Sequence, residues 1–498
     1  MPRNDVPVSV LLDALPERRV IGAPPATIGG LTADSRRVQA GDCFVAVPGF
    51  KQDARRFVPD AVARGAHLVV TEGEPLADLG VAQVLVPSTR RALARLAGAY
   101  YGHPSLGLAL VGITGTNGKT TTSYLVDALL RARGLRTGIV GTIQYVLGDE
   151  VRPAGQTTPE ALEIQAMLAE MRQRGIGGVA MEVSSHALAL SRVEGLAFDV
   201  GVFTNLTQDH LDFHGTLEEY RRAKRRLFEQ LATSPKPRPT AVVNADDPAG
   251  AEMVRGLDLT VLTFGLGRPA TVRAVEHDSS LAGIRMTVDT PRGRLTLASP
   301  LIGEHNVMNL LGAVGAGLAL GMEPAAIAAA LAPVSTVPGR FEQVHAGQPF
   351  LVVVDYAHTP DALERVLTTA RKITPGRLAV VFGCGGDRDR TKRPIMGEIA
   401  ARLADRAWVT SDNPRSERPE AILDEIVVGV KRVAGAEARY VTEADRRRAI
   451  AGALAWAQAG DTVVIAGKGH ETYQIIGGET LPFDDRAVAR DMLAGRRS

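Results

Sequence analysis

One pattern recurs along this 498-residue chain: a short, continuous apolar run ends abruptly in polar side chains. Examples are LALVGITG before the loop at Gly115, GGVAMEVSSH, TAVVNADDP and FLVVVDYAHTP. Strands that are buried on both faces of a parallel sheet are apolar throughout, so these runs, alternating with helices, predict parallel sheets. Because ligands bind beyond the carboxyl ends of such strands, the polar residues that follow each run are the candidate functional residues.

The length of the chain predicts about three domains, because a single hydrophobic core rarely serves so many residues. We expect an α/β protein with a small α/β domain at residues 1–106, a central P-loop domain with a parallel sheet at 107–336, and a Rossmann-like domain at 337–498. In the first region, GDCFVAVPG, AHLVVTEG and AQVLVPS predict strands. YYGHPSLG is the expected first linker, and VSTVPGRFE the expected hinge before the third domain.

Composition excludes several classes of protein. A formal net charge of +2 gives no reason to expect a nucleic-acid partner, and the two cysteines, Cys43 and Cys384, suit a reducing cytoplasm. The amino terminus has no run typical of a signal peptide. The most apolar region starts at Asn309 and is interrupted by Glu323 after about 14 residues, short of the roughly 20 that a membrane span needs. We therefore expect a cytoplasmic monomer without membrane insertion, in which this region forms two packed helices.

The segment GITGTNGKTTT, residues 112–122, predicts a phosphate-binding loop between a strand and a helix. The usual P-loop spacing would place a glycine where Ile113 stands, and the nearest glycine is instead Gly115. Loop amides and a helix amino terminus attract an anion, Lys119 can reach terminal phosphates, and the Thr120 hydroxyl can ligate Mg²⁺. The alternative is a tight turn with a capping threonine, but the Lys-Thr pair at a helix start favours phosphate binding.

Two further segments offer ligands for a metal ion. Glu182 ends a predicted strand, where a carboxylate either holds Mg²⁺ near a P-loop or is a satisfied structural group. His210 lies among acids and a second histidine in TNLTQDHLDFHG, which can hold a second metal or simply cap a helix with solvent-facing acids.

The pattern around three other residues is less specific. Lys224 follows in a basic helical segment, and this pattern alone favours one more exposed charge on that helix. Asn306 and Asn309 open an apolar helix, and each of them either caps it or contacts a nucleotide.

Together these segments resemble the Mur ligase family, over nearly the whole chain and in order. The segments that carry the resemblance are GTNGKTT, TTPE, MEVSSHAL, TNLTQDHLDFHG, AKRRLF, GEHNVMNLL, VPGRFE, VDYAHTPDAL, FGCGGDRDRTKRP, SDNPRSE and AGKGHE. The resemblance implies ATP-dependent formation of an amide bond: the γ-phosphate of ATP activates a carboxylate as an acyl phosphate, which an amine then attacks. Positioning and charge neutralisation lower the barrier of such a transfer.

The resemblance also implies roles for individual residues. It implies catalytic roles for Lys119, Glu182, His210 and Lys224. It implies Mg²⁺ held by Thr120, Glu182, His210 and Lys224, the lysine being carbamylated by CO₂. It implies ATP contacts at Gly115, Thr116, Asn117, Gly118, Lys119, Thr120, Thr121, Asn306, Asn309, Arg340 and Asp355.

The substrates implied are ATP, UDP-MurNAc-L-Ala-D-Glu and meso-diaminopimelate. The amino-terminal domain resembles the family's uridine-nucleotide site, with Ser35 and a loop around Phe50 to Gln52. The implied muramyl-peptide contacts are Thr157, Thr158, Ser184 and Arg192, and the implied diaminopimelate contacts are Arg388, Asp412, Asn413, Pro414, Arg415, Gly467 and Glu471. The chain departs from some relatives at Leu190, where they carry glutamine, and at Gln156, where they carry asparagine.

Several alternatives remain open on the sequence. Within the family they are a ligase that adds L-lysine, the later ligase that adds D-Ala-D-Ala, and folylpolyglutamate synthase. The DNPR motif and the DSR segment at residues 34–36 of the amino-terminal domain favour the ligase that forms the muramyl-tripeptide. The planar cation of Arg415 favours meso-diaminopimelate as its amino acid, because it suits a distal carboxylate that L-lysine lacks. Arg415 could instead brace the turn after Pro414. A P-loop kinase or nucleotide switch is the alternative from another class, and it gives no role to Arg415 and Glu471.

Overall fold

A computed structural model gives the structure of residues 5–49, 53–267, 269–335 and 337–495. By its internal contacts the chain divides into two compact units. Unit 1 comprises Met1–Glu276, Met286–Leu297 and Met308–Leu331, and unit 2 comprises His277–Arg285, Ala298–Val307 and Ala332–Ser498. The predicted loop around Phe50 to Gln52 and residue Thr336 of the predicted hinge lie outside the described residues.

The amino-terminal region is a small α/β domain built on the strands that its apolar runs predict. The sheet has the order β2-β7-β6-β5-β4, with β4 to β7 parallel and β2 antiparallel to β7. Its strands are β2 Arg19–Ile21, β4 Gly30–Thr32, β5 Asp42–Val45, β6 Ala66–Thr71 and β7 Ala82–Leu85, and β1 Val6–Pro7 pairs with β3 Thr27–Ile28. The helices are α1 Val8–Asp13, α2 Val58–Ala63 and α3 Thr89–Tyr100, with 3₁₀ turns at Ser35–Arg37, Ala54–Phe57 and Pro104–Gly107.

The middle region forms a sheet with the order β11-β10-β9-β12-β8-β13-β14-β15-β16-β17-β18. From β9 through β16 neighbouring strands are parallel. The strands are β8 Ala109–Thr114, β9 Thr137–Val140, β10 Gln144–Leu147, β11 Glu150–Pro153, β12 Gly178–Glu182, β13 Val200–Phe203, β14 Thr240–Asn244, β15 Thr260–Gly265, β16 Val272–Ser280, β17 Gly283–Thr290 and β18 Gly293–Ser299. Every residue of β12, β13 and β14 is buried, as the continuous apolar runs predict.

Helices connect these strands, and two more follow β18. Their bounds are α4 Lys119–Ala132, α5 Ala161–Gln173, α6 Ser185–Ala189, α7 Leu211–His214, α8 Leu217–Ala232, α9 Pro248–Val254, α10 Glu304–Ala319 and α11 Pro324–Leu331. The prediction of two packed Ala-rich helices is confirmed by α10 and α11. A Cβ on Gly317 of α10 would lie 2.8 Å from Cγ1 of Ile327 in α11, so only glycine permits this close approach.

The carboxyl ends of the central strands meet at one edge of the sheet. Glu182 of β12 pairs with Ile113 of β8, and Phe203 of β13 pairs with Thr114 of β8. The chain leaves β8 through α4 toward β9, on the β12 side, and later reaches β13 on the other side of β8. The carboxyl end of β8 is therefore a switch point in the strand order, the place where doubly wound sheets bind ligands.

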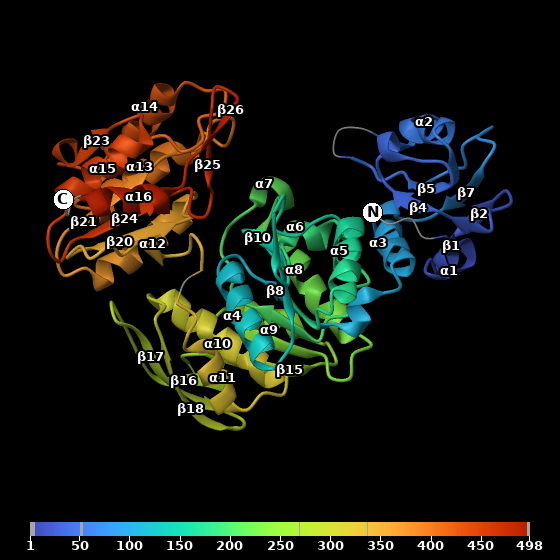
Figure 1. Cartoon of the computed structure of the whole chain (residues 1–498), viewed down its shortest axis with the longest axis horizontal. Coiled ribbons are helices and arrows are strands. Elements are labelled where there is room, and N and C mark those ends of the chain that lie inside the picture. Colours follow the sequence, from blue (N-terminus) through green and yellow to red (C-terminus); the bar gives the residue numbers. More distant parts are fainter. Residues whose placement is uncertain (1–4, 50–52, 268, 336, 496–498) are drawn as a thin grey trace. The chain divides into compact units, whose positions relative to one another are not determined.

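The carboxy-terminal region is a second doubly wound sheet, the Rossmann-like domain that the sequence predicts (Figure 1, orange to red). Its order is β19-β20-β24-β21-β22-β23, and all neighbours except β19 are parallel. The strands are β19 Glu342–Gln343, β20 Leu351–Asp355, β21 Leu378–Phe382, β22 Arg406–Val409, β23 Tyr440–Thr442 and β24 Thr462–Ala466, followed by the hairpin β25 Tyr473–Ile476 and β26 Glu479–Pro482. The helices are α12 Pro360–Ile373, α13 Lys392–Leu403, α14 Pro419–Val430, α15 Arg446–Trp456 and α16 Asp485–Ala494.

The two cysteines are buried in different sheets. Cys43 lies in β5 with 0% of its surface exposed, and Cys384 lies just after β21 with 2% exposed. Burial raises the pKa of each thiol to about 12. Among the residues that the structure describes, no helix combines the length and the apolar character needed to cross a membrane.

Candidate active site

The loop after β8 has the geometry of a phosphate-binding loop. Gly118 has a φ of +86° and precedes α4, which begins at Lys119. Gly115 has a φ of +150°, and a Cβ there would lie 1.8 Å from Oγ1 of Thr204, so no other residue fits this position. The loop is held by Asn205, whose carbonyl accepts from the Thr116 amide at 2.8 Å and whose side chain accepts from the Asn117 amide at 3.0 Å.

Two lysines converge on this loop. Nζ of Lys119 donates to the carbonyl oxygens of Gly115 and Thr116 at 2.9 and 2.8 Å. Nζ of Lys224, from α8, donates to the same Gly115 oxygen at 2.8 Å. Lys224 is only 1% exposed, so the expectation from its basic helix, an exposed charge, is wrong. Burial, and then the charge of Lys119, hold the pKa of the Lys224 amine well below its usual range.

Glu182 and Thr120 lie together beside the loop, as a magnesium site requires. Oγ1 of Thr120 donates to Oε2 of Glu182 at 3.0 Å, and Glu182 is 1% exposed. Thr142 donates its amide to Oε1 at 2.9 Å and its hydroxyl to Oε2 at 3.0 Å. Hydroxyl and carboxylate oxygens are the ligands that Mg²⁺ prefers, so this donor set fits the ion.

The predicted muramyl-peptide residues lie next to Glu182. Thr158 donates its hydroxyl to the carbonyl oxygen of Glu182 at 2.8 Å and accepts from the amide of Ser184 at 3.0 Å. Oγ1 of Thr157 lies 3.1 Å from Oγ1 of Thr142. Arg192 donates to the Thr158 carbonyl at 3.0 Å. The structure thus brings Thr157, Thr158, Ser184 and Arg192 to the carboxyl edge that carries the phosphate-binding loop.

Three other residues expected near this substrate, Ser35, Gln156 and Leu190, differ in place or chemistry. Ser35 begins a 3₁₀ turn after β4, in the amino-terminal sheet. Gln156, where some relatives have asparagine, is bonded through its side-chain oxygen to Arg192. Leu190 is the C-cap of α6 and offers no hydrogen-bonding side chain.

His210 belongs to a cluster of histidines from α6 and α7. The ring of His186 lies 4.8 Å from that of His210 and 5.5 Å from that of His214, measured between centroids. Burial, followed by the neighbouring histidines, lowers the pKa of His186 to about 4, and partial burial lowers the pKa of His210. A neutral imidazole keeps the lone pair that a metal ion needs. Sequence reasoning gave His186 no role, although it ends the MEVSSH segment.

The remaining predicted nucleotide residues fall into two places. A Cβ on Gly118 would lie 2.3 Å from Oδ1 of Asn309, so Asn309 of α10 faces the phosphate-binding loop. Asn306, one turn earlier and inside the first turn of α10, donates its side-chain amide to the carbonyl oxygen of Ile302 at 2.8 Å. Asn309 is in unit 1, whereas Asn306, Arg340 and Asp355 are in unit 2. The guanidinium of Arg340 lies 5.1 Å from the centre of the Tyr356 ring, and Asp355, which ends β20, has its pKa raised by burial.

A second polar cluster lies at the carboxyl edge of the sheet in unit 2. Nζ of Lys468 donates to Oδ1 of Asn413 at 3.1 Å and to Oε2 of Glu471 at 3.0 Å. Nδ2 of Asn413 donates to the same Glu471 oxygen at 3.0 Å. A Cβ on Gly467, which has a φ of +115°, would lie 2.6 Å from Oδ2 of Asp412. Asp412, Asn413, Gly467 and Glu471 therefore lie together at this edge.

Arg415 has a backbone that is fixed in an unfavourable region. Its φ is +54°, a left-handed conformation that costs an L-residue roughly 1–2 kcal/mol. The hairpin β25–β26 holds it there: the Arg415 amide donates to the Ile475 carbonyl at 3.0 Å, and the Gly477 amide donates to the Arg415 carbonyl at 2.8 Å. Strain of this kind persists where surrounding contacts over-determine it, and it is common at ligand sites.

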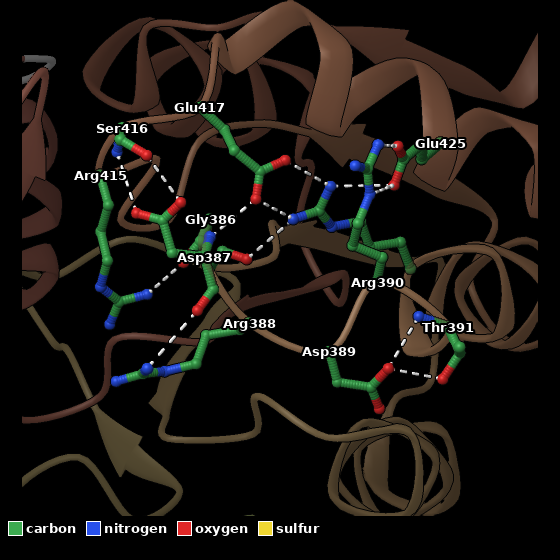
Figure 2. A network of polar contacts seen from close by, with 12 residues as sticks. Gly386, Asp387, Arg388, Asp389, Arg390, Thr391, Arg415, Ser416, Glu417 and Glu425 are labelled. Atoms are coloured by element: carbon green, nitrogen blue, oxygen red, sulfur yellow. Dashed lines mark hydrogen bonds and ion pairs between the residues drawn. The ribbon is translucent and has the colours of Figure 1, made fainter.

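Arg388 and Arg415 come from neighbouring loops. A Cβ on Gly385 would lie 2.9 Å from Nη1 of Arg415 and 3.7 Å from Cγ of Arg388. Figure 2 shows both side chains extending to the same side of the network. Nη1 of Arg415 donates to the Gly386 carbonyl at 2.7 Å, while Arg388 is exposed. The two loops pack closely at Pro414, since a Cβ on Gly386 would lie 1.8 Å from the Pro414 carbonyl oxygen.

A buried arginine that sequence reasoning did not single out braces these loops. Arg393 of α13 is 0% exposed and donates to Glu417 at 2.8 Å, to Glu425 at 2.9 Å and to the Gly385 carbonyl at 3.3 Å. Glu417 in turn accepts from the Asp387 amide at 2.7 Å (Figure 2). Lys468 was likewise given no role, and only its position in GKGHE, after an apolar run, pointed to it.

Comparison with known proteins agrees with this geometry. Residues 27–101 match the family model described as "Mur ligase family, catalytic domain", residues 113–317 match "Mur ligase middle domain", and residues 339–469 match "Mur ligase, glutamate ligase domain". With three matched domains and a phosphate-binding loop in the middle one, the chain belongs to the Mur ligase family.

Two relatives about half identical to the chain share one named activity. UDP-N-acetylmuramoyl-L-alanyl-D-glutamate--2,6-diaminopimelate ligase of Geobacillus thermodenitrificans (strain NG80-2) is 48% identical over 492 residues, 98% of this chain and 100% of that protein. The ligase of the same name from Gloeobacter violaceus (strain ATCC 29082 / PCC 7421) is 50% identical over 477 residues, 95% and 96% of the two chains. A solved structure of such a ligase superposes with a TM-score of 0.70 at 35% identity, covering 96% of this chain and 97% of that one.

Proposed function

We propose that the chain is an ATP-dependent acid–amino-acid ligase that adds meso-diaminopimelate to the D-Glu γ-carboxylate of UDP-MurNAc-L-Ala-D-Glu, in peptidoglycan precursor synthesis in the cytoplasm. The observation that carries the proposal is the cluster of Arg388, Arg415, Asn413 and Glu471 at one sheet edge. It offers cations for a distal carboxylate and an acceptor for a distal ammonium. The relatives of nearly full length and near 50% identity support the same substrate.

In this proposal the P-loop edge activates the carboxylate. Loop amides from Gly115 to Thr121 and the amino terminus of α4 hold the ATP phosphates. Lys119 leaves the carbonyls of Gly115 and Thr116 and neutralises charge on the γ-phosphoryl as it moves to the D-Glu carboxylate. Thr157, Thr158, Ser184 and Arg192 hold the muramyl peptide so that its carboxylate reaches that phosphoryl, and Asn309 contributes from α10. The incoming amine then displaces phosphate from the acyl phosphate.

Thr120 and Glu182 hold one Mg²⁺, and His210 with a carbamylated Lys224 holds a second. Bound Mg²⁺ supplies positive charge to the phosphate oxygens. The proposal for Lys224 rests on two observations. The side chain is buried, and its Nζ lies 2.8 Å from the Gly115 carbonyl oxygen in the phosphate-binding loop. The amine and CO₂ form a carbamate with release of one proton, and this converts a group that cannot ligate a cation into one that can.

The carbamate is tested by mass and by activity. Intact-mass or peptide analysis at neutral pH with added bicarbonate should find 44 Da more on the Lys224 peptide, as the mass of CO₂ requires. Lys224→Ala should lose most activity and regain part of it with a small added carboxylate. Arg225→Ala, the next residue on the same helix, is the matched control. An unmodified and fully active Lys224 would contradict the proposal.

Substrate recognition divides among the domains. We propose that residues 1–106, with Ser35, bind the uridine nucleotide, that residues 107–336 bind ATP, and that residues 337–498 bind the amino acid. Arg340 and Asp355 complete the nucleotide contacts from the third domain, together with Asn306. Gly467 belongs with the amino-acid residues because its backbone adjoins Asp412.

The decisive experiment compares amino acids. ATP, UDP-MurNAc-L-Ala-D-Glu and either meso-diaminopimelate or L-lysine are supplied at equal concentration, and product and phosphate are measured. A site built to pair a polar group rejects an analogue that lacks it by about 10⁴ in favourable cases, so only diaminopimelate should give rapid amide formation. Equal use of L-lysine would overturn the substrate assignment. Phosphate release without any amide product, with every amino acid, would indicate a kinase or nucleotide switch instead.

A further inference from the structure

Arg446 is a fully buried guanidinium directly behind the two loops that carry the proposed amino-acid residues. It is the first residue of α15, it is 0% exposed, and its side chain faces Asp485, the first residue of α16, also 0% exposed. Nε and Nη2 of Arg446 donate to the two carboxylate oxygens of Asp485 at 2.8 and 2.7 Å. This is a two-pronged pair of fixed geometry.

The same guanidinium also binds two backbone carbonyls. Nη1 donates to the Ser411 carbonyl at 3.3 Å, and Nη2 donates to the Ala466 carbonyl at 2.9 Å. Ser411 immediately precedes Asp412, and Ala466 immediately precedes Gly467. These carbonyls are thus the last backbone acceptors before the DNPR and GKGHE segments begin.

The two loops that Arg446 joins do not follow neighbouring strands. Ser411 follows β22, Ala466 ends β24, and β21 lies between those strands in the sheet. Ladder hydrogen bonds therefore cannot set the distance between the loops directly. The loop after β21, which leads to Arg388, packs against the loop after β22, since a Cβ on Gly383 would lie 2.1 Å from the Thr410 carbonyl.

Electrostatics couples Arg446 to the same loops. Burial lowers the pKa of the guanidinium, but Asp485, Asp412 and Glu471 outweigh burial and raise it. The buried charge of Arg446 therefore interacts with both carboxylates at the edge of the proposed amino-acid site. Replacing a buried ion pair by apolar residues of similar volume is often neutral for stability, so stability alone gives little reason for a charged pair here.

We infer that Arg446, oriented by Asp485, is a positioning residue that sets the separation of the Asp412–Arg415 and Gly467–Glu471 loops and thereby the selectivity for a diamino dicarboxylic acid. This inference rests on the proposed function of those loops. Arg446 does not touch the substrate. It acts through the Ser411 and Ala466 carbonyls, so its loss shifts several contacts of the amino acid at once.

The test uses two conservative variants and a matched control pair. Arg446→Lys keeps the charge but loses the planar fork, and Asp485→Asn keeps the shape but loses the charge. The control is the Arg377–Asp461 ion pair, 2.6 Å between Nη2 and Oδ2, just before β21 and β24. It ties the amino ends of the same sheet and is remote from the two loops. Arg377→Lys and Asp461→Asn therefore report the cost of losing an ion pair without moving the site.

Arg446→Lys and Asp485→Asn should each raise KM for diaminopimelate by about 10-fold or more, because a displacement of about 1 Å in positioning groups costs up to about 10²-fold. The preference for diaminopimelate over L-lysine in kcat/KM should fall by a similar factor, while KM for ATP stays within about twofold of wild type. The control variants should lower Tm without changing KM or preference. These readouts separate positioning from stability.

Two outcomes would overturn the inference: unchanged KM and preference in both variants despite a lower Tm, or failure of both variants to fold, which would make the pair purely structural. If the wild type uses L-lysine as well as diaminopimelate, the proposed substrate is wrong. The inference is then still decided by the KM for whichever amino acid is used, compared with the KM for ATP.

Discussion

At the scale of single residues, Lys119 and Lys224 share one acceptor, the Gly115 carbonyl, and they differ in how much each must change to act. Lys119 is at the start of α4 and needs only to turn from the loop carbonyls to a phosphate. Lys224 is buried and can contribute a ligand only after modification. One carbonyl oxygen therefore holds both lysines in place before substrates bind.

Lys119→Ala should lower kcat by about 10²–10³-fold or more, because it removes a cation aimed at developing negative charge. The fold should persist, since Asn205 and the backbone hold the loop without the lysine. Turnover and circular dichroism check both halves of the prediction. Lys236→Ala is the control, because Lys236 donates to the Leu108 carbonyl before β8, at the opposite end of that strand from the loop. Near-normal turnover in the Lys119 variant would contradict the assignment of this loop as a phosphate-binding loop.

Arg415 makes backbone strain and binding separable. Glycine adopts a left-handed φ without strain, whereas alanine keeps the strain. The free energy of unfolding of Arg415→Gly should therefore be about 1 kcal/mol higher than that of Arg415→Ala. Both should lose the preference for diaminopimelate equally, because both lose the guanidinium.

Arg388 provides the matched comparison for Arg415, because it is not among the positive-φ residues. There the order should reverse, with Arg388→Gly less stable than Arg388→Ala. Urea titrations of the four variants measure these differences. An alanine variant of Arg415 as stable as its glycine variant would show that the strain is absent in solution.

At the scale of helices and strands, the sequence predicts the positions of the buried strands well, but it predicts poorly which charged side chains are buried. Continuous apolar runs mark β8, β12, β20 and β24 because a strand buried on both faces needs apolar residues throughout. The residues after those runs are the candidate site, because the ends of parallel strands must meet. No comparable rule predicts which charged residue of a helix faces the protein interior.

Lys224 and Arg446 illustrate that limit. Lys224 sits in a helix with several arginines, and which residue turns inward depends on tertiary packing. Arg446 is the first of three consecutive arginines, of which Arg447 and Arg448 are exposed. The positive φ of Arg415 is equally hidden, since the distant hairpin β25–β26 imposes it. Resemblance to a family found Lys224, and only the structure found Arg446.

We expect a histidine in the loop after β24, His470, to make unit 2 sensitive to acid. Burial, followed by Arg340 and Arg486, lowers the pKa of His470 to about 4. The unfolded chain binds a proton near pH 6.5 and the folded chain only near pH 4, so stability is full above pH 6.5 and falls as the pH drops toward 4. We expect this group to cost about 2 kcal/mol at pH 4 after allowing for screening.

His470→Gln should reduce that loss, measured by urea unfolding at several pH values. His345→Gln is the control, because His345 is an exposed histidine in the same unit. The wild-type slope should persist in the control variant. An unchanged slope in His470→Gln would mean that other groups carry the acid sensitivity.

At the scale of the whole molecule, the candidate residues are divided between the two units. The phosphate-binding loop and the muramyl-peptide residues are in unit 1, while Arg340, Asp355 and the amino-acid cluster are in unit 2. Amide formation needs an acyl phosphate and an amine in contact and protected from water. We therefore expect the particle to become more compact when an ATP analogue and UDP-MurNAc-L-Ala-D-Glu bind together. Small-angle scattering measures this, and an unchanged radius of gyration with both ligands would contradict it.

Because both native cysteines are buried, fluorescent dyes can be attached selectively to cysteines introduced at the surface. Cys43 and Cys384 are the only thiols of the chain, and each has a pKa of about 12, so neither reacts readily with maleimide dyes in the folded state. A pair of cysteines introduced at exposed positions, one replacing Val151 of β11 and one replacing Val428 of α14, would then carry the dyes alone. Energy transfer between them would follow the separation of the two units during turnover, one molecule at a time, without removing a native residue.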